Sequence, residues 1–204
     1  MAVGLDKMEP PVERTDEEWM LRLKAGHKDA FDVLVGKYRT PVIHFLYRIV
    51  HEPALAEELA QEVFLRVYRA RTRYQPRARF STWMFRIATN VGLNALRDGR
   101  MRRARETSMH EDHKLEGAVA AAAHPAPTAE ETMLEAERSR QIRQAVEALP
   151  EKQRLAVLMH KYQELDYSEI ADVLDCSESA LKSLLFRAYE TLRVRLRPLL
   201  GVRQ

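Results

Sequence analysis

The chain has 204 residues, of which 46% are hydrophobic and 31% charged, and its formal net charge is +3. This length allows one or two domains, and the composition is that of a folded globular protein. Only seven residues are glycine, which disfavours a turn-rich β fold and a glycine-rich nucleotide loop, so we expect an all-α protein of two small helical domains.

The N-terminal part of the chain is predicted to be helical after a short tail. Residues 1–15 are polar and interrupted by prolines, so we expect them to be disordered. Residues 16–105 carry apolar side chains at helical spacing in four segments, the third over residues 53–70 and the fourth over residues 81–96. The apolar residues of the first three segments are Trp19, Leu21 and Leu23; Phe31, Leu34, Val35, Tyr38, Val42, Ile43, Leu46 and Ile49; and Leu55, Leu59, Val63 and Val67. In the fourth segment we expect an inward face made of Trp83, Ile87, Ala88, Val91 and Ala95.

A basic loop is predicted between the third and fourth helices, at residues 71–79, because Pro76 restrains the preceding residue from helical geometry. From Arg66 to Arg105 the charged residues are arginines, apart from the single acid Asp98, whereas the third helix is acidic. Aromatic side chains beside arginines suit single-stranded bases, which stack on rings while guanidinium groups meet phosphates. The aromatic residues in or beside this loop are Tyr74, Phe80 and Trp83, of which the last two would serve equally well as core residues. The run of charge can also be a solvated face.

Residues 106–133 differ sharply in composition from what surrounds them, with an alanine run that has no apolar stripe and is followed by prolines. We expect a flexible linker that orders only on a partner. The lone Cys176 excludes an internal disulfide and suits a reducing cytoplasm. No apolar run reaches the length of a membrane span and no signal peptide is recognisable, so we expect a cytoplasmic protein.

A helix-turn-helix is predicted within a second domain at residues 134–200. Asp166 can cap a short helix, with Glu169 three residues on, and Ser177 can cap a second one after a turn at residues 175–176. The inward face of the second helix is Leu181, Leu185, Ala188 and Leu192, and the outward face is Glu178, Lys182, Ser183, Phe186 and Arg187. In this motif the second helix enters the major groove of duplex DNA. A simple helical hairpin would show a similar pattern.

The motifs together resemble the extracytoplasmic-function (ECF) group of bacterial sigma factors, over residues 17–199 apart from the linker. They are Ala30-Phe31, LAQEVF at residues 59–64, RFSTWMFRIATN at residues 79–90, Leu149-Pro150 with Arg154, and YSEIA at residues 167–171 continuing to Leu192. The resemblance implies a sigma region 2 domain at residues 16–105 and a sigma region 4 domain at residues 134–200. It also implies a promoter-specificity subunit of RNA polymerase, which is not an enzyme and needs no cofactor or metal.

The resemblance also implies three sets of site residues. Binding of the core polymerase, at the clamp helices of its largest subunit, falls on Glu58, Gln61, Glu62 and Phe64. Capture of a flipped base of the downstream promoter element falls on the basic loop and fourth helix, at Tyr74, Gln75, Arg77, Arg79, Phe80, Arg86, Asn90, Asn94 and Arg97. Reading of the upstream element as duplex falls on Ser177, Ser179, Lys182, Ser183, Phe186 and Arg187. Further implied partners are the flap of the second polymerase subunit and an anti-sigma factor.

Two departures from the family pattern bear on DNA binding. Leu184 stands where many relatives have arginine, and Asp98 stands where they are usually basic. The first puts affinity for the upstream element in doubt, and Lys182 with Arg187 would then carry more of it. Despite the second, we expect Arg97 and Arg100 to reach phosphate.

Other interpretations of the sequence stay open. A stand-alone transcription regulator could use the same helix pair, but it would leave the acidic helix and basic loop unexplained. A polymerase-binding regulator or scaffold with little DNA reading is encouraged by Leu184. An enzyme is disfavoured because the chain has no phosphate loop, zinc-protease helix or nucleophile elbow, and His110 with His113 is a weak metal pair.

Overall fold

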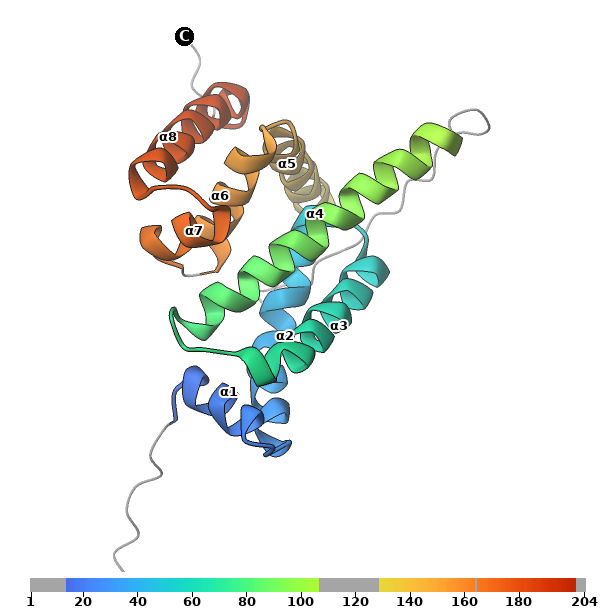
Figure 1. Cartoon of the computed structure of the whole chain (residues 1–204). Coiled ribbons are helices and arrows are strands. Elements are labelled where there is room, and N and C mark those ends of the chain that lie inside the picture. The colour runs from blue at the N-terminus through green and yellow to red at the C-terminus, as the bar shows by residue number, and fades with distance from the viewer. Residues whose placement is uncertain (1–13, 107–128, 164, 201–204) are drawn as a thin grey trace, which may run out of the picture.

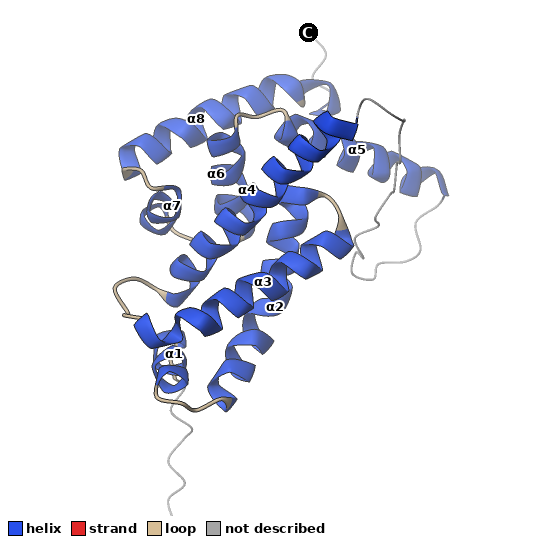
Figure 2. Ribbon diagram, turned by 45° about the vertical axis from the view of Figure 1, so that its right-hand side comes forward, coloured by secondary structure: helices blue, strands red, loops and turns tan. Residues whose placement is uncertain are grey.

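The computed structural model describes residues 14–106, 129–163 and 165–200, and every regular element within them is a helix (Figures 1 and 2). The elements in chain order are α1 (Asp16–Lys24), α2 (Asp29–Val50), α3 (Pro53–Ala70), η1 (Arg71–Arg73), α4 (Phe80–Glu106), α5 (Ala129–Glu147), α6 (Glu151–Tyr162), α7 (Tyr167–Leu174), α8 (Glu178–Arg195) and η2 (Arg197–Leu200). The prediction of an all-α fold is confirmed.

Helices α1 to α4 share one apolar core. Helix α3 begins with Pro53 in its first turn, where a missing N–H breaks no helical hydrogen bond. Its observed bounds match the predicted range, residues 53–70. The predicted break after it is also observed, because the chain turns through η1 into a non-helical loop before Phe80. Fully buried side chains from all four helices fill the centre, among them Met20, Leu34, Phe45, Leu46, Val63, Phe80 and Met84.

Helix α4 buries more of its surface than its sequence indicated. Ala88 and Val91 face inward as predicted, but Met84 and Phe85 are the large buried residues, while Trp83 and Ile87 are only partly buried. The physical reason is that α4 is covered on two sides, since it packs on α2 and α3 and also against α7. Such a helix has no single apolar stripe.

The C-terminal half has the predicted helix-turn-helix. Asp166 and Glu169 form a reciprocal capping box at the start of α7, and the Ser177 hydroxyl accepts a hydrogen bond from the backbone N–H of Ala180 at the start of α8. Asp175 ends α7 in the left-handed region, with φ of 51°. The predicted inward residues of α8 are all buried, namely Leu181, Leu185, Ala188 and Leu192. These caps and this stripe fix the angle at which α8 leaves α7.

The two halves are in contact. Helix α7 lies beside α4 (Figures 1 and 2), and α6 also contacts α2. Helix α5 begins at Ala129, inside the segment predicted as linker, whose residues 107–128 lie outside the described residues, as does the tail at residues 1–13. In the described residues, none of the helices has the length and apolar character that a membrane span requires.

Candidate nucleic-acid interface

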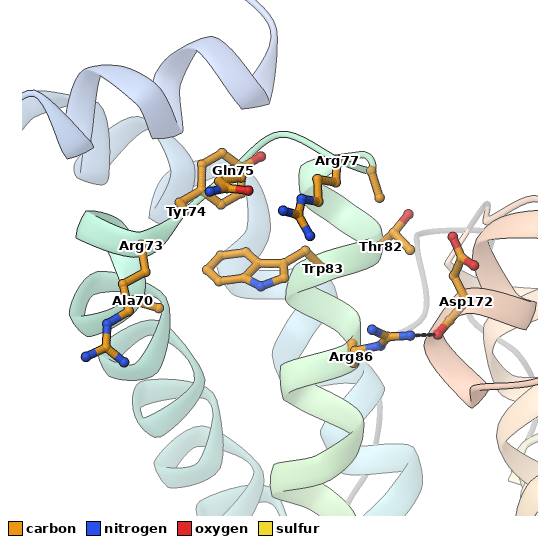
Figure 3. A pocket seen from close by; sticks show the side chains of 10 residues that line it. Ala70, Arg73, Tyr74, Gln75, Arg77, Thr82, Trp83, Arg86 and Asp172 are labelled. Carbon is orange, nitrogen blue, oxygen red and sulfur yellow. Dashed lines mark hydrogen bonds between the residues drawn. The ribbon is translucent and has the colours of Figure 1, made fainter.

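A hollow lies between the loop that follows η1 and the first turns of α4 (Figure 3). Its volume is about 610 Å³. It is lined by Ala70, Arg73, Tyr74, Gln75, Arg77, Ala78, Thr82, Trp83, Arg86 and Asp172. The basic loop therefore forms one wall of a pocket that also has an aromatic ring and an amide side chain.

The lining of the pocket combines three kinds of group. Arg73, Arg77 and Arg86 supply positive charge, and all three side chains are exposed. Trp83 supplies an aromatic ring that is partly exposed, and Gln75 supplies an exposed amide with both donor and acceptor atoms. A ring, an amide and guanidinium groups are the contacts that a single unpaired base and its phosphate can use.

Two aromatic residues predicted to contact DNA lie in the core instead of on the surface. Phe80 is fully buried, and Tyr74 has 4% of its surface exposed. The Tyr74 and Trp83 ring centroids are 5.1 Å apart, and those of Phe80 and Trp83 are 5.9 Å apart. Burial, with the nearby carboxylates of Glu17 and Asp16, raises the pKa of Tyr74 to about 12, so its phenol is neutral. Both rings pack against Trp83 on its buried side. A direct contact of either ring with DNA would require the loop to change its conformation.

The predicted polar face of α4 is present on the surface. Asn90 and Asn94 are exposed, one turn apart, on the same helix as the exposed Arg86 and Arg97. The side chain of Arg100 lies outside what the structure describes. Both amide side chains are therefore accessible to DNA, as their predicted role in reading bases requires.

Several predicted DNA contacts are engaged with the C-terminal half in this structure. Arg86 donates a hydrogen bond to the backbone carbonyl of Asp172 (Figure 3), and a guanidinium nitrogen of Arg79 lies 3.6 Å from a carboxylate oxygen of Glu169. Arg97 lies 3.5 Å from the Glu151 carboxylate at the start of α6. Helix α7 thus covers one edge of the surface proposed for the downstream element.

A buried hydrogen bond holds this contact, and the sequence did not predict it. The hydroxyl of Thr82 donates to the Glu169 carboxylate across 2.9 Å, and both residues are buried. The other carboxylate oxygen of Glu169 accepts the backbone N–H of Asp166 in the capping box. The capping pattern accounted for Glu169 by itself, so no signal in the sequence indicated a partner 87 residues away in the chain.

The second helix of the helix-turn-helix presents an exposed polar and aromatic face. Lys182, Ser183 and Arg187 are exposed, and Phe186 has 69% of its surface exposed. Leu184 is half-buried beside this face. This face of α8 therefore presents two cations and an aromatic ring to solvent.

The two serines at the start of α8 are used locally. The hydroxyl of Ser177 caps the helix and lies 3.1 Å from that of Ser179, which is also exposed. At the preceding cap, a hydrogen bond from the Ser168 hydroxyl, together with one from the backbone N–H of Glu169, holds the pKa of Asp166 below its usual range. The carboxylate is therefore charged near neutral pH, where it caps the start of α7.

The residues predicted to bind polymerase divide into exposed and buried ones. On α3, Glu58 and Gln61 are exposed, and Glu62 pairs with Arg66 across 2.7 Å. Phe64 has 8% of its surface exposed and meets Phe31 edge to face, with ring centroids 6.5 Å apart. The polar side chains can contact a partner directly, whereas Phe64 packs α3 onto the core.

Comparison with known proteins gives consistent matches to both halves. The family model described as Sigma-70 region 2 matches residues 34–102, and the one described as Sigma-70, region 4 matches residues 139–192. The RNA polymerase sigma-H factor of Pseudomonas aeruginosa is 33% identical over 186 residues, which cover 91% of this chain and 95% of the relative. The ECF RNA polymerase sigma-E factor of Escherichia coli K12 is 31% identical over 189 residues, covering 91% of this chain and 96% of the relative.

Solved structures share the fold at lower identity. The structure of CnrH in complex with the cytosolic domain of CnrY has a TM-score of 0.64 and 21% identity, covering 90% of this chain and 97% of that one. The sigma factor RpoE of Bartonella quintana, in complex with the anti-sigma factor NepR, has a TM-score of 0.63 and 16% identity, covering 82% of this chain and 96% of that one. These likenesses support the helical architecture.

Proposed function

Because this chain belongs to the ECF group of the sigma-70 family and is an RNA polymerase sigma factor, we propose a division of promoter recognition between its two halves. The N-terminal half captures an unpaired base of the downstream promoter element in the pocket beside Trp83. The C-terminal half reads the upstream element as duplex through α8.

The pocket carries the first part of this proposal. Unstacking a base costs a few kcal/mol, which stacking and hydrogen bonds to the base edge can largely offset. Trp83 offers the ring, Gln75 the amide, and Arg77 a cation for the flanking phosphate. Asn90 lies on α4, as Trp83 does, and is proposed to contact a neighbouring base. Melting then draws on binding energy and needs no ATP.

The exposed face of α8 supports the second part. Lysine and arginine can meet guanine acceptors or phosphates in the major groove, and an aromatic ring can meet a thymine methyl group. Lys182, Arg187 and Phe186 have these roles in the proposal, and Leu184 adds an apolar contact where an arginine would add a charge. We therefore expect fewer phosphate contacts than an arginine at residue 184 would give.

The remaining partners follow from the family and from the exposed surfaces. Glu58, Gln61 and Glu62 on α3 are proposed to dock on the clamp helices of core RNA polymerase, which performs all the chemistry. The flap of the second polymerase subunit is proposed to contact the C-terminal half. An anti-sigma factor is a further expected partner, since a relative of the same fold is bound to one. The chain is proposed to act in the cytoplasm, without enzymatic activity of its own.

The contact between α4 and α7 must open before both halves of the chain can bind DNA, because Arg79 and Arg86 face α7 in this structure. Replacing Thr82 by valine keeps the shape of the side chain but removes the donor to one carboxylate oxygen of the buried Glu169, which costs about 1–3 kcal/mol in the closed arrangement. We expect the free protein to bind promoter DNA on the order of tenfold more tightly, since a larger fraction is open. Fluorescence anisotropy with a fork-junction promoter measures this.

A matched variant controls for the loss of a buried hydroxyl. Thr89 is buried on the same helix and donates only to the carbonyl of Phe85, one turn earlier, so Thr89→Val leaves the contact with α7 intact. We expect its DNA affinity to equal that of the wild type. Equal affinities for Thr82→Val and the wild type would contradict the need for opening.

Transcription in vitro tests the proposed function. Purified protein and core RNA polymerase are given a random promoter library, and the transcripts are sequenced. Defined start sites that share a two-part upstream motif are the expected result. Retained polymerase binding without transcripts would favour the alternative of a polymerase-binding scaffold that reads little DNA, which Leu184 encourages.

A further inference from the structure

Helix α1 holds both ends of the loop that forms the proposed base pocket. The carboxylate of Glu17 accepts a hydrogen bond from the backbone N–H of Phe80 across 2.6 Å, at the end of the loop. The ammonium group of Lys24 donates to the backbone carbonyl of Tyr74 across 2.8 Å, at its start. Helix α1 lies outside residues 34–102, which match the region 2 family model.

The contact from Glu17 acts as a helix cap supplied from another helix. Phe80 is the first residue of α4, and the first N–H groups of a helix have no partner within it. A carboxylate there makes a charge-assisted hydrogen bond and interacts favourably with the helix dipole. Glu17 therefore fixes where α4 begins, and with it the direction in which Thr82, Trp83 and Arg86 point.

The contact from Lys24 fixes the other end. A lysine ammonium on a carbonyl oxygen holds Tyr74, the residue at which the chain leaves η1. Between the two fixed ends the loop has one internal backbone hydrogen bond, from the N–H of Arg77 to the carbonyl of Gln75 across 2.9 Å. The side chains of Gln75, Arg77 and Arg79 are exposed, and Arg79 lies 3.6 Å from Glu169. The backbone contacts from α1 therefore hold the loop together with that pair and with the buried rings of Tyr74 and Phe80 at its two ends.

Helix α1 is itself firmly anchored. Met20 and Leu23 are buried in the core, at 0% and 1% exposure. At its first turn, the Asp16 carboxylate accepts hydrogen bonds from Lys37 and from the Tyr38 hydroxyl, both on α2. A helix fixed in this way is a rigid support for a neighbouring loop.

We infer that Glu17 and Lys24 are positioning residues that hold the loop in its base-capturing shape, a role that rests on the proposed function of the pocket. They act on DNA only through the loop backbone. A merely structural role would change the stability of the whole protein, whereas a positioning role changes the order of the loop and its choice of base.

The test uses Glu17→Ala, Lys24→Met and the double variant in the full chain. Hydrogen exchange of the loop amides, at residues 75 and 77–80, is measured in the free protein. Promoter opening by the holoenzyme is measured on the promoter found by the library experiment and on copies with the captured base changed. Glu52→Ala and Lys28→Met are matched controls, because the side chains of these exposed residues make no hydrogen bond or ion pair to any residue that the structure describes.

We expect faster exchange at the loop amides, opening slowed by about tenfold, and reduced discrimination against the changed base, with polymerase affinity unchanged. The conservative variants Glu17→Gln and Lys24→Arg keep an acceptor and a donor, so they should restore most of the discrimination. Loop exchange or base discrimination that stays at the wild-type level in the double variant would overturn the inference.

A different result would identify failure of the proposed function. If the wild-type holoenzyme itself shows no preference at any base of the downstream element, the pocket does not read a base and the positioning role fails with it. The exchange measurement, made without DNA, would still decide whether α1 holds the loop.

Discussion

Replacing Lys182 and Arg187 together by alanine should lower the affinity of the holoenzyme for its promoter by about a hundredfold, since each base or phosphate contact contributes about 1–3 kcal/mol. Both side chains are exposed on α8, on either side of Phe186, so neither substitution disturbs the core. The slope of log affinity against log salt concentration should also fall, by about one for each phosphate contact that is lost. Titrations at several salt concentrations measure both quantities.

The control for this prediction comes from the same helix. Arg193→Ala with Arg195→Ala removes two exposed arginines near the C-terminal end of α8, where Arg193 pairs with Glu190 across 2.9 Å. Because the N-terminal part of such a helix meets the base edges, we expect this pair to change affinity much less. An equal loss for both pairs would indicate a general charge effect and contradict the assignment of α8 as reader.

Replacing Phe80 by alanine should reduce the free energy of unfolding by about 3–5 kcal/mol, because it leaves a cavity in place of a fully buried ring. The ring packs against Tyr38, Tyr74 and Trp83, so its loss also removes the support of the pocket. Urea unfolding followed by circular dichroism measures the stability.

Arg77→Ala provides the contrasting case. Arg77 is exposed in the same loop and has no side-chain hydrogen bond or ion pair to the residues that the structure describes. We expect its unfolding free energy to stay within about 0.5 kcal/mol of the wild type, while promoter opening falls. If Phe80→Ala were as stable as the wild type, the placement of Phe80 in the core would be wrong.

Local chemistry explains which parts of the fold could be predicted from the sequence. The caps at Asp166 and Ser177 depend on residues within three positions of one another, and α3 has a proline at one end and a basic loop after the other. Each of these signals is complete within one segment. The helix-turn-helix and the break before α4 were therefore predicted correctly.

Contacts between distant segments explain what could not be predicted. The sequence indicated that Phe80 suited either stacking or the core and that Tyr74 suited stacking, and only the packing around them shows that both are buried. The partners of Glu17 and Glu169 lie 63 and 87 residues away. Both carboxylates look like ordinary acids of a helical first turn, so their part in the site is visible only in three dimensions.

The most direct test of the proposed base pocket is to place a photoreactive amino acid at residue 75, in place of Gln75, and to map its crosslinks in the holoenzyme on promoter DNA. Residue 75 is exposed and lines the pocket beside Trp83. Capture of one base predicts crosslinks to a single nucleotide of the non-template strand in the downstream element, formed only in the open complex. Crosslinks spread over the duplex, or confined to the closed complex, would contradict it.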